Sequence, residues 1–445
     1  MKVFMLGWEF PPYISGGLGT ACYGLTRGLD QSGVEVSFVL PMAVPQQASG
    51  HVTLRTPSTL TQARAKARGK NVEEDLATGF EHVTMHVVPA ILQPYGNPAS
   101  FQEALARLRK LHALTEGEEA IFSIPPAAMG GSAQAGRYEG DLMQQVRRYA
   151  QLAIELARRE RFDVIHAHDW MTYPAGLAVA AYTGKPLVVH VHSTESDRSG
   201  ENVNQPVYDI ERAGMHGANK VVCVSHLTRN ICLNRYGVPP EKVDVVYNAV
   251  EDREHVNGDF RPIARDEKIV LFLGRVTMQK GPEYFLYAAK KVLEKFTNVR
   301  FVIAGSGDMI GRAVELTAQL GIGRYVTFTG FLRGADVAKV FRMADLYVMP
   351  SVSEPFGIAP LEALAHNVPV IISKQSGVSE VLTHVLKVDF WDVDEMANKI
   401  LAVLRHPPLQ RVLRQQGHIE LRKLSWRDSA EKVKKIYEEV VASAP

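Results

Sequence analysis

The segment Glu354-Pro-Phe-Gly-Ile-Ala-Pro-Leu-Glu362 carries the residues whose types and spacing best fit a chemical role. It follows an apolar run that predicts a strand and opens a helical pattern, so its first backbone amides can bind anions and hydroxyl groups. Glu354 precedes the helix, where it can hold sugar hydroxyls, and Glu362 lies further in, where it can bind a ribose. The alternative is a capping glutamate followed by a solvated one. The amides of the helix start belong to Phe356, Gly357 and Ile358.

A second candidate is the loop from Gly274 to Gly281, which again connects a predicted strand to a predicted helix. Arg275 and Lys280 place two cations on this short loop. A guanidinium binds phosphate in a bidentate way and an ammonium acts as a point charge, so the pair suits a pyrophosphate. Basic residues are common in loops, and it is the position at the carboxyl end of a strand that favours a phosphate site.

Adjacent glycines, Gly16 and Gly17, follow the first predicted strand and precede a helix. Glycine lets the backbone approach a phosphate closely at such a helix start. The spacing is not the GxGxxG of dinucleotide-binding proteins, nor is that of Gly305-Ser-Gly307-Asp-Met-Ile-Gly311. The acidic residue that a nicotinamide cofactor needs at a strand end about 20 positions later is also missing. The sequence therefore disfavours a dehydrogenase.

Two histidine-rich segments, His166-Ala-His168-Asp169-Trp170 and His190-Val-His192, stand at the ends of predicted strands. Alternating histidines on a strand point to one face and could bind zinc. Neither segment has a strong metal-binding spacing such as HExxH, and Asp and His bind sugar hydroxyls equally well. Asp392-Val-Asp394 could be mistaken for a metal-binding DxD, but its place before a helix predicts an N-cap. We therefore predict no metal site.

Length and composition limit the class of protein. A chain of 445 residues exceeds the roughly 250–300 residues of a single hydrophobic core, so we expect two domains. With 50 basic and 48 acidic residues, the net charge of +2 favours neither nucleic acid nor an anionic membrane as partner. Three scattered cysteines fit a reducing compartment, and no segment approaches the ~20 apolar residues of a bilayer span. We expect a soluble, cytoplasmic protein whose first apolar run is a strand and not a signal peptide.

Strand and helix patterns alternate along both halves of the chain. This alternation predicts an α/β protein with two doubly wound, Rossmann-like domains that face each other across a cleft. We expect an acceptor-side domain at 1–255 that carries polar insertions at 41–140, a donor domain at 266–424, and a C-terminal helix at 425–445, capped by Ser425, that packs back onto the first domain. Strands are expected at 2–6, 34–40, 83–88, 163–166, 187–191, 221–224, 243–247, 269–273, 300–304, 326–329, 346–349, 368–372 and 385–388.

Taken together, these motifs resemble the retaining GT-B glycosyltransferases, the superfamily of glycogen and starch synthases and sucrose-synthase-like enzymes. The resemblance covers the whole chain and includes Val-Tyr-Asn248 before a polar linker at 251–268. It implies that Arg275 and Lys280 contact the donor phosphates and that Glu354 lies beside the donor sugar. It further implies that Glu362 binds the nucleotide ribose, His192 a donor sugar hydroxyl, and Asp169 the sugar and acceptor side.

Within this superfamily, Leu-Gly-Trp-Glu-Phe-Pro-Pro and His-Ala-His-Asp-Trp look most like glycogen synthases. The resemblance implies a hexosyltransferase that moves glucose from UDP- or ADP-glucose to an α-glucan, with no metal or other cofactor. Ile14 stands where those enzymes commonly carry a phosphate-binding lysine, so a small sugar, sugar-phosphate or lipid-linked acceptor is the second hypothesis. The third is a catalytically silent sugar-binding protein on the same fold.

Overall fold

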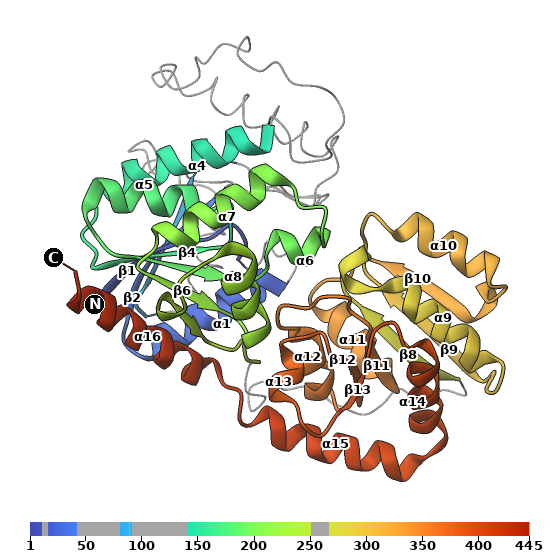
Figure 1. The fold of residues 1–445 in the computed structure, drawn as a ribbon. Helices are drawn as coiled ribbons and strands as arrows, with labels where there is room; N and C mark the ends of the chain where they lie inside the picture. Colours follow the sequence, from blue (N-terminus) through green and yellow to red (C-terminus); the bar gives the residue numbers. More distant parts are fainter. Residues whose placement is uncertain (11–16, 42–80, 89, 91–140, 251–266, 445) are drawn as a thin grey trace, which may run out of the picture.

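The computed structural model describes residues 1–10, 17–41, 81–88, 90, 141–250 and 267–444. Most of the predicted insertion at 41–140, most of the linker at 251–268, the predicted site residue Gly16, and Ile14 lie outside the described residues. The described residues form two parallel sheets, each covered by helices on both faces (Figure 1). The predicted α/β class with two Rossmann-like domains is confirmed.

The first sheet has seven strands in the order β3-β2-β1-β4-β5-β6-β7. Its strands are β1 (Lys2–Leu6), β2 (Glu35–Pro41), β3 (Val83–Val88), β4 (Val164–His168), β5 (Leu187–Val191), β6 (Lys220–Cys223) and β7 (Val243–Val245). Helices α1 (Gly17–Gln31) and α16 (Trp426–Ala442) pack against each other on one face, and α4 (Asp141–Ala157), α5 (Tyr173–Thr183) and α7 (Gln205–Gly217) cover the other (Figure 1). Helices α6 (Glu195–Ser199) and α8 (His226–Tyr236) follow β5 and β6.

The second sheet has six strands in the order β10-β9-β8-β11-β12-β13. Its strands are β8 (Lys268–Leu273), β9 (Val299–Ala304), β10 (Val326–Gly330), β11 (Leu346–Met349), β12 (Val370–Ser373) and β13 (Leu386–Val388). Its helices are α9 (Pro282–Leu293), α10 (Ile310–Gln319), α11 (Ala335–Met343), α12 (Ile358–Ala365), α13 (Val378–Val381), α14 (Val393–Arg405) and α15 (Pro407–Leu421). A short 3-10 helix, η6 (Met278–Lys280), follows β8.

The second sheet is apolar on both faces because its strands are covered twice. Along β8, Val270 and Phe272 join one buried cluster with α9 and α14, whereas Ile269 and Leu271 join another. That other cluster also contains the core of the first domain, reached through Phe356 among others. Apolar packing therefore connects the two domains.

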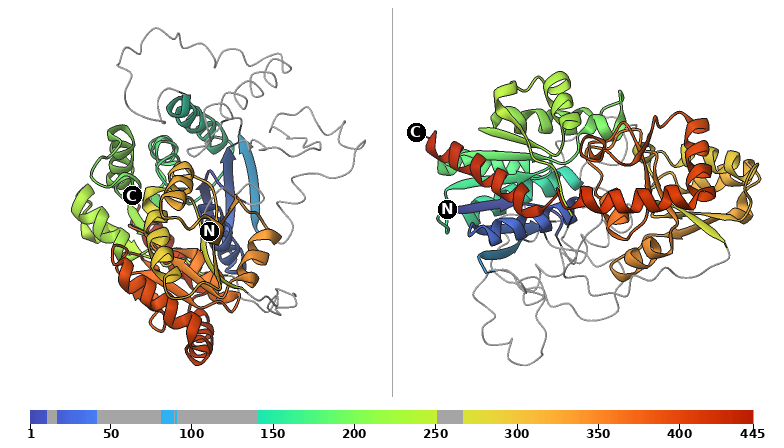
Figure 2. Two further views of the ribbon diagram at one scale, coloured as in Figure 1. Left: turned by 90° about the vertical axis from the view of Figure 1, so that its right-hand side faces the viewer. Right: turned by 90° about the horizontal axis from the view of Figure 1, so that it is seen from below.

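The C-terminal helix returns to the first domain, as the right-hand view of Figure 2 shows. Ser425 caps it, since the backbone N–H of Asp428 donates to the Ser425 hydroxyl over 3.1 Å. The contact with α1 is close, because a Cβ added to Gly24 would lie 2.1 Å from the Trp426 ring. The same substitution at Gly28 would bring Cβ to 2.4 Å from the Trp426 carbonyl oxygen, so both glycines are required by packing.

The predicted strands agree with the structure, most of them to within two residues at each end. Helices α5, α7 and α15 were not predicted, and they contain internal glycines or begin with proline. The three cysteines are free and buried, as expected. Within the described residues, none of the helices has both the length and the apolar character to cross a bilayer.

Candidate active site

The order of each sheet reverses at one place, between β1 and β4 in the first and between β8 and β11 in the second. In doubly wound sheets, ligands bind outside the carboxyl ends of the strands at such a switch point. The loop after β8 carries Arg275 and Lys280, and the loop after β11 carries Glu354. Asp169 directly follows β4, so the predicted residues lie at the edges where this rule places a ligand.

Glu354 and Lys280 form an ion pair that joins the loops after β11 and β8. The Glu354 side chain is 8% exposed and that of Lys280 20%, so the pair is largely shielded from water. Ser351 donates a second hydrogen bond to the same carboxylate oxygen over 3.2 Å. The Glu354 backbone is fixed as well, because its N–H donates to the carbonyl oxygen of Gln375 over 3.0 Å. The carboxylate and the ammonium are thus positioned by the fold.

Two glycines permit this arrangement. Gly281, directly after Lys280, has a φ of 65°, and a Cβ there would lie 2.2 Å from the carbonyl oxygen of Pro350. Gly357 directly precedes α12 with a φ of 102° and lies beside the Glu354 side chain, where a Cβ would come 3.2 Å from its Cγ. Both positions need the left-handed conformation that L side chains avoid. The sequence signal for both was their place directly before a predicted helix that follows a strand.

Arg275 and Gly274 lie on a loop that packs against the loop after β9. Gly274 has a φ of 154°, and a Cβ on Gly305 would come 1.8 Å from its carbonyl oxygen. Gly307 has the same close approach to the Val276 carbonyl oxygen, at 2.2 Å. Gly305 and Gly307 therefore allow the loop after β9 to pack against the loop after β8, and the sequence did not reveal this contact. Arg275 is half-buried in this double loop.

The start of α12 brings the remaining donor-side candidates together. Phe356 and Ile358 are buried, and Glu362 lies about one turn further along the helix, partly buried. Burial raises the pKa of Glu362 to about 7. Both Glu354 and Glu362 lie near Tyr347 of β11, since each raises the pKa of that phenol, whose main cause of elevation is burial. At neutral pH Glu362 can therefore both donate to and accept from a hydroxyl.

On the first domain, the structure brings Asp169 and His192 together. The backbone N–H of His192 donates to Asp169 Oδ1 over 2.9 Å. Asp169 has a φ of 60°, which is strained for a residue with a side chain and is typical of functional turns. Burial raises the pKa of Asp169 to about 7 despite this hydrogen bond. A buried carboxyl with such a pKa suits binding or proton transfer to hydroxyl groups.

The four histidines form one stacked cluster. His168 and His192 share a hydrogen bond of 2.9 Å, and Nδ1 of His166 lies 2.5 Å from the Tyr437 hydroxyl of α16. Burial lowers the pKa of His190 to about 3, so the ring is neutral at ordinary pH. The planes of His166 and His190 are inclined by only 8°, and those of His190 and His192 by 20°.

Among the described residues, two groups of three side chains bring ligand atoms within 4.8 Å of one another, Cys22 with His168 and His192, and His166 with His168 and His190. The absence of a metal site therefore stays a prediction. Several buried ring nitrogens in the cluster have no hydrogen-bond partner among the described residues. The Asp392 carboxylate accepts from the N–H of Glu395 over 2.9 Å, so its predicted role as an N-cap is confirmed.

The predicted phosphate site at the start of α1 meets a competing charge. The Glu9 carboxylate is buried and accepts from the backbone N–H of Gly19 over 3.1 Å, in the first turn of α1. A phosphate at this helix start would face that negative charge at close range. Among the described residues, nothing lies within 4 Å of a Cβ built on Gly17, so their packing does not require glycine there. Sequence reasoning missed Glu9 as a cap because it lies outside the helical pattern.

Hydrogen bonds between the two domains meet at Glu354. Ser353 donates to Asp197 Oδ1 over 2.6 Å, and Ser225 donates to the Pro355 carbonyl oxygen over 2.5 Å. Helix α6, which carries Asp197, also packs against η6, which carries Lys280. The two sheet edges that bear the candidate residues therefore face each other. Asp197 and Ser225 were not predicted as site residues.

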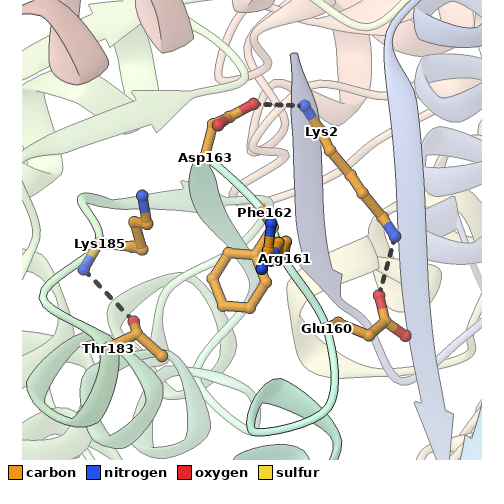
Figure 3. Close-up of a pocket in the computed structure, with 7 residues that line it drawn as sticks. All are labelled: Lys2, Glu160, Arg161, Phe162, Asp163, Thr183 and Lys185. Atoms are coloured by element: carbon orange, nitrogen blue, oxygen red, sulfur yellow. Dashed lines mark hydrogen bonds and ion pairs between the residues drawn. The ribbon is translucent and has the colours of Figure 1, made fainter.

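A separate hollow of about 370 Å³ lies at the opposite end of the first sheet (Figure 3). Lys2 begins β1 there, and its side chain pairs with Glu160 over 3.2 Å while its backbone N–H donates to Asp163 over 2.7 Å. Lys185 and Thr183 line the hollow just before β5. These are the amino ends of the strands, where doubly wound sheets do not bind their ligands, so we do not assign this hollow to the chemistry.

Comparison with known proteins agrees with this geometry. The family model for glycosyl transferases group 1 matches residues 258–419, and the model for glycosyltransferase family 4 matches residues 138–254. An uncharacterized glycosyltransferase of Methanocaldococcus jannaschii is 30% identical over 399 residues, which cover 86% of this chain and 83% of that protein. A D-inositol 3-phosphate glycosyltransferase of Mycobacterium sp. strain KMS is 27% identical over 66% of this chain and 73% of its own.

Solved structures share the fold across the whole chain. Sucrose-phosphate synthase from Thermosynechococcus elongatus superposes with a TM-score of 0.68 at 19% identity and covers 100% of both chains. HepE of Anabaena, solved in complex with UDP and glucose, gives a TM-score of 0.64 at 16% identity, covering 99% of this chain and 100% of its own. By its family matches, its relatives and its fold, this chain belongs to the GT-B glycosyltransferase superfamily.

Proposed function

We propose that the chain transfers a hexosyl group, most simply glucose, from a nucleoside diphosphate sugar to a small phosphorylated acceptor, with retention of configuration. The observation that carries the proposal is the shielded Lys280–Glu354 ion pair, which joins the two strand ends of the switch point beside the start of α12. A cation that suits phosphate and a carboxylate that suits sugar hydroxyls lie side by side there, which supports the proposal. We further propose that no metal ion or other cofactor takes part.

In this proposal the departing nucleoside diphosphate is stabilised by Lys280, Arg275 and the amides that open α12. Leaving-group charge develops as the sugar–phosphate bond breaks, and fixed cations and helix dipoles stabilise that charge without reorganisation. Lys280 is held in place by Glu354, and it exchanges part of this pairing for phosphate when the donor binds. Glu362 binds the ribose, for which its pKa of about 7 permits hydrogen bonds of either direction.

The first domain contributes the sugar and acceptor side. Asp169 and His192 are held together by the backbone hydrogen bond between them, and they hold hydroxyl groups of the donor sugar and the acceptor. The acceptor hydroxyl attacks on the face from which the diphosphate departs, and the leaving oxygen receives its proton. This route retains the configuration at the anomeric carbon.

Two similar proteins support a small acceptor. One is a D-inositol 3-phosphate glycosyltransferase, and the other is a sucrose-phosphate synthase. The α-glucan acceptor is the second candidate, favoured by the resemblance of His166-Ala-His168-Asp169-Trp170 to glycogen synthases. We propose action in the cytoplasm, because three buried, unpaired thiols fit a reducing compartment.

The test is a matrix of donors and acceptors, with release of nucleoside diphosphate as readout. UDP-, ADP- and GDP-glucose are each combined with inositol phosphates, hexose phosphates and glycogen. We expect release that depends on one phosphorylated acceptor, continues in EDTA, and yields an α-linked product from an α-linked donor by NMR. Elongation of glycogen alone would favour the second candidate, and donor binding without turnover in every combination would contradict transfer.

A further inference from the structure

We infer that Asp197 and Ser225 of the first domain are positioning residues for Glu354, which set the catalytic carboxylate through the peptides on either side of it. The inference deepens the proposed function and rests on the role that it gives to Glu354. Its basis is that Ser353 and Pro355, the two neighbours of Glu354 in the chain, are both hydrogen-bonded to first-domain side chains. Glu354 is thereby fixed from both sides by the other domain.

On one side, Ser353 donates to a carboxylate that is itself held rigidly. Asp197 is 2% exposed, and its Oδ2 accepts from both the backbone N–H and the hydroxyl of Thr194 over 2.8 Å. Thr194 and Asp197 form the capping box of α6, so Oδ1 remains to receive Ser353 over 2.6 Å. A charged acceptor strengthens such a bond, and its burial keeps water from replacing it.

Helix α6 is anchored in turn. Arg198, next to Asp197, pairs with Glu195 over 3.1 Å and with Glu211 of α7 over 2.5 Å, and both carboxylates are buried. These ion pairs hold the five-residue helix in a fixed position against the first sheet. Without such contacts, a helix of this length would be only marginally stable. Ser353 therefore meets a rigid partner that belongs to the first domain.

On the other side, the Pro355 carbonyl oxygen accepts from two hydroxyls at the start of α8. Ser225 donates over 2.5 Å and Thr228 over 3.3 Å, and both side chains are fully buried. Gly377 makes room for this contact, because a Cβ there would lie 2.2 Å from the Pro355 carbonyl oxygen and 2.5 Å from Ser225 Cβ. The glycine requirement shows that the two domains approach closely at this turn.

Glu380 of the second domain completes the contact from the solvent side. Its carboxylate accepts from the backbone N–H groups of His226 and Leu227 over 2.9 and 2.8 Å, and from the Tyr247 hydroxyl over 2.9 Å. A carboxylate suits the start of α8, where backbone donors lack helical partners. This exposed contribution is smaller than the buried one, so the positioning role falls on Asp197 and Ser225.

The position of Glu354 therefore depends on domain contact as well as on its own domain. Within the second domain, the Val352 N–H donates to the Gln279 carbonyl oxygen over 2.9 Å, and Glu354 itself is held by Gln375. These bonds tie the segment to the Lys280 loop but leave the Ser353 hydroxyl and the Pro355 carbonyl to the first domain. The carboxylate consequently reaches its full geometry when the domains are together.

The test replaces Ser353 with alanine in the full chain and compares it with Ser379→Ala. Ser379 is a serine of the same domain whose hydroxyl donates to carbonyl oxygens of Lys374 and Ser376, without reaching the first domain. With UDP-glucose and the acceptor found in the matrix, Ser353→Ala should lower kcat about five- to tenfold with donor KM nearly unchanged. Ser379→Ala should leave kcat unchanged, and Ser353→Thr, which keeps a hydroxyl, should restore most of the rate.

A double-mutant cycle with Glu354→Gln separates this inference from the proposed function. If Ser353 acts through Glu354, Ser353→Ala should have no further effect on kcat in the Glu354→Gln background. An equal loss in both backgrounds would overturn the inference while leaving the proposed function intact. Full activity of Glu354→Gln alone would instead overturn the proposed role of Glu354, and the inference with it.

Ser225→Ala provides a second, independent arm, with Ser425→Ala as control. Both serines cap a helix, Ser225 at α8 and Ser425 at α16, and Ser225 alone of the pair donates to Pro355. Similar falls in melting temperature with a loss of kcat confined to Ser225→Ala would support positioning. Equal kcat values in the two variants at matched stability would overturn it for Ser225.

Discussion

The candidate site has two sides, and the fold positions them in different ways. The second-domain edge is formed by the loops after β8 and β11, and the first-domain edge by the segments after β1 and β4. After β8 and β11, glycines with positive φ and close backbone contacts hold an ion pair, Lys280–Glu354, in position. After β4, the first domain instead buries Asp169, a carboxyl whose pKa is raised by its surroundings. The start of α1 is occupied by Glu9, and none of the described residues lies within 4 Å of a Cβ built on Gly17.

We propose that the two edges have different roles in the reaction. A preorganised cation serves a leaving group of constant chemistry, a diphosphate, and it acts without reorganisation during the reaction. A buried carboxyl with a pKa near neutrality is suited to hydroxyl groups, which differ between acceptors. In the proposed function, the second domain therefore binds the diphosphate, which is the constant part of the reaction, and the first domain binds the hydroxyl groups, which vary.

Removing the cation should have the largest effect and would test the second-domain edge. We expect Lys280→Ala to lower kcat about 10²–10³-fold, because it removes one electrostatic contact to the leaving group and leaves Glu354 shielded without its partner. Steady-state release of nucleoside diphosphate measures it. Lys291→Ala is the matched control, since Lys291 forms a well-exposed pair with Asp394 in the same domain. Equal rates for the two variants would contradict the assignment.

Asp169→Asn tests the first-domain edge through both activity and pH-dependent stability. Because the folded pKa of Asp169 is about 7 and the reference value is 3.8, the folded state binds more protons than the unfolded state between these values. Stability from this group is thus present below about pH 4 and is lost as pH rises to about 7. Asparagine does not titrate, so the variant should be more stable than the wild type at pH 8, by about 4 kcal/mol, and similar at pH 4.

Chemical denaturation at the two pH values measures this difference, and the same variant should be nearly inactive. A stability difference that is equal at both pH values would show that Asp169 does not titrate as its burial predicts. Full activity of the variant would show that Asp169 has no role in the reaction. The expected pH dependence of stability would still hold, because it depends only on the raised pKa of Asp169.

Much of this organisation could be predicted from the sequence, because it is encoded locally. Strands such as Lys2–Leu6 and Leu187–Val191 are short apolar runs bounded by polar residues. The ends of β4, β8 and β11, predicted in the same way, place Asp169, Arg275, Lys280 and Glu354 at one kind of edge. Helix α5 was missed because Tyr-Pro-Ala-Gly-Leu-Ala-Val-Ala-Ala-Tyr-Thr is apolar almost throughout and shows no helical period.

The contacts between the domains could not be predicted, because their residues are distant in sequence. Ser353 and Asp197 are 156 positions apart, and Ser225 and Pro355 are 130 apart. Ser225 precedes α8 as its N-cap, and Asp197 lies in the first turn of α6, where it completes the capping box with Thr194. Nothing in either local pattern indicates a second partner. The close approach of Gly305 to Gly274 was hidden for the same reason.

Gly281→Ala should have a moderate effect and tests whether the second-domain edge is fixed by its backbone. The position has a φ of 65°, and the new Cβ would lie 2.2 Å from the Pro350 carbonyl oxygen, which is backbone and cannot turn aside. We expect a loss of unfolding free energy of about 1–3 kcal/mol and a lower kcat, since the shift displaces Lys280. Urea denaturation measures the first, and unchanged stability would contradict the strained geometry.

Gly17→Ala is the same substitution at the first-domain edge, and there the expected effect on stability is the smallest. A Cβ at Gly17 meets none of the described residues within 4 Å, and alanine is the better residue inside a helix, so the free energy of unfolding should change by less than about 0.5 kcal/mol. Activity then becomes informative, because a stable variant reports on the ligand alone. A raised donor KM with intact stability would show that a phosphate or sugar approaches this glycine despite Glu9. An unchanged KM would instead restrict donor recognition to the second-domain edge, where the fold has already fixed Lys280 and Glu354.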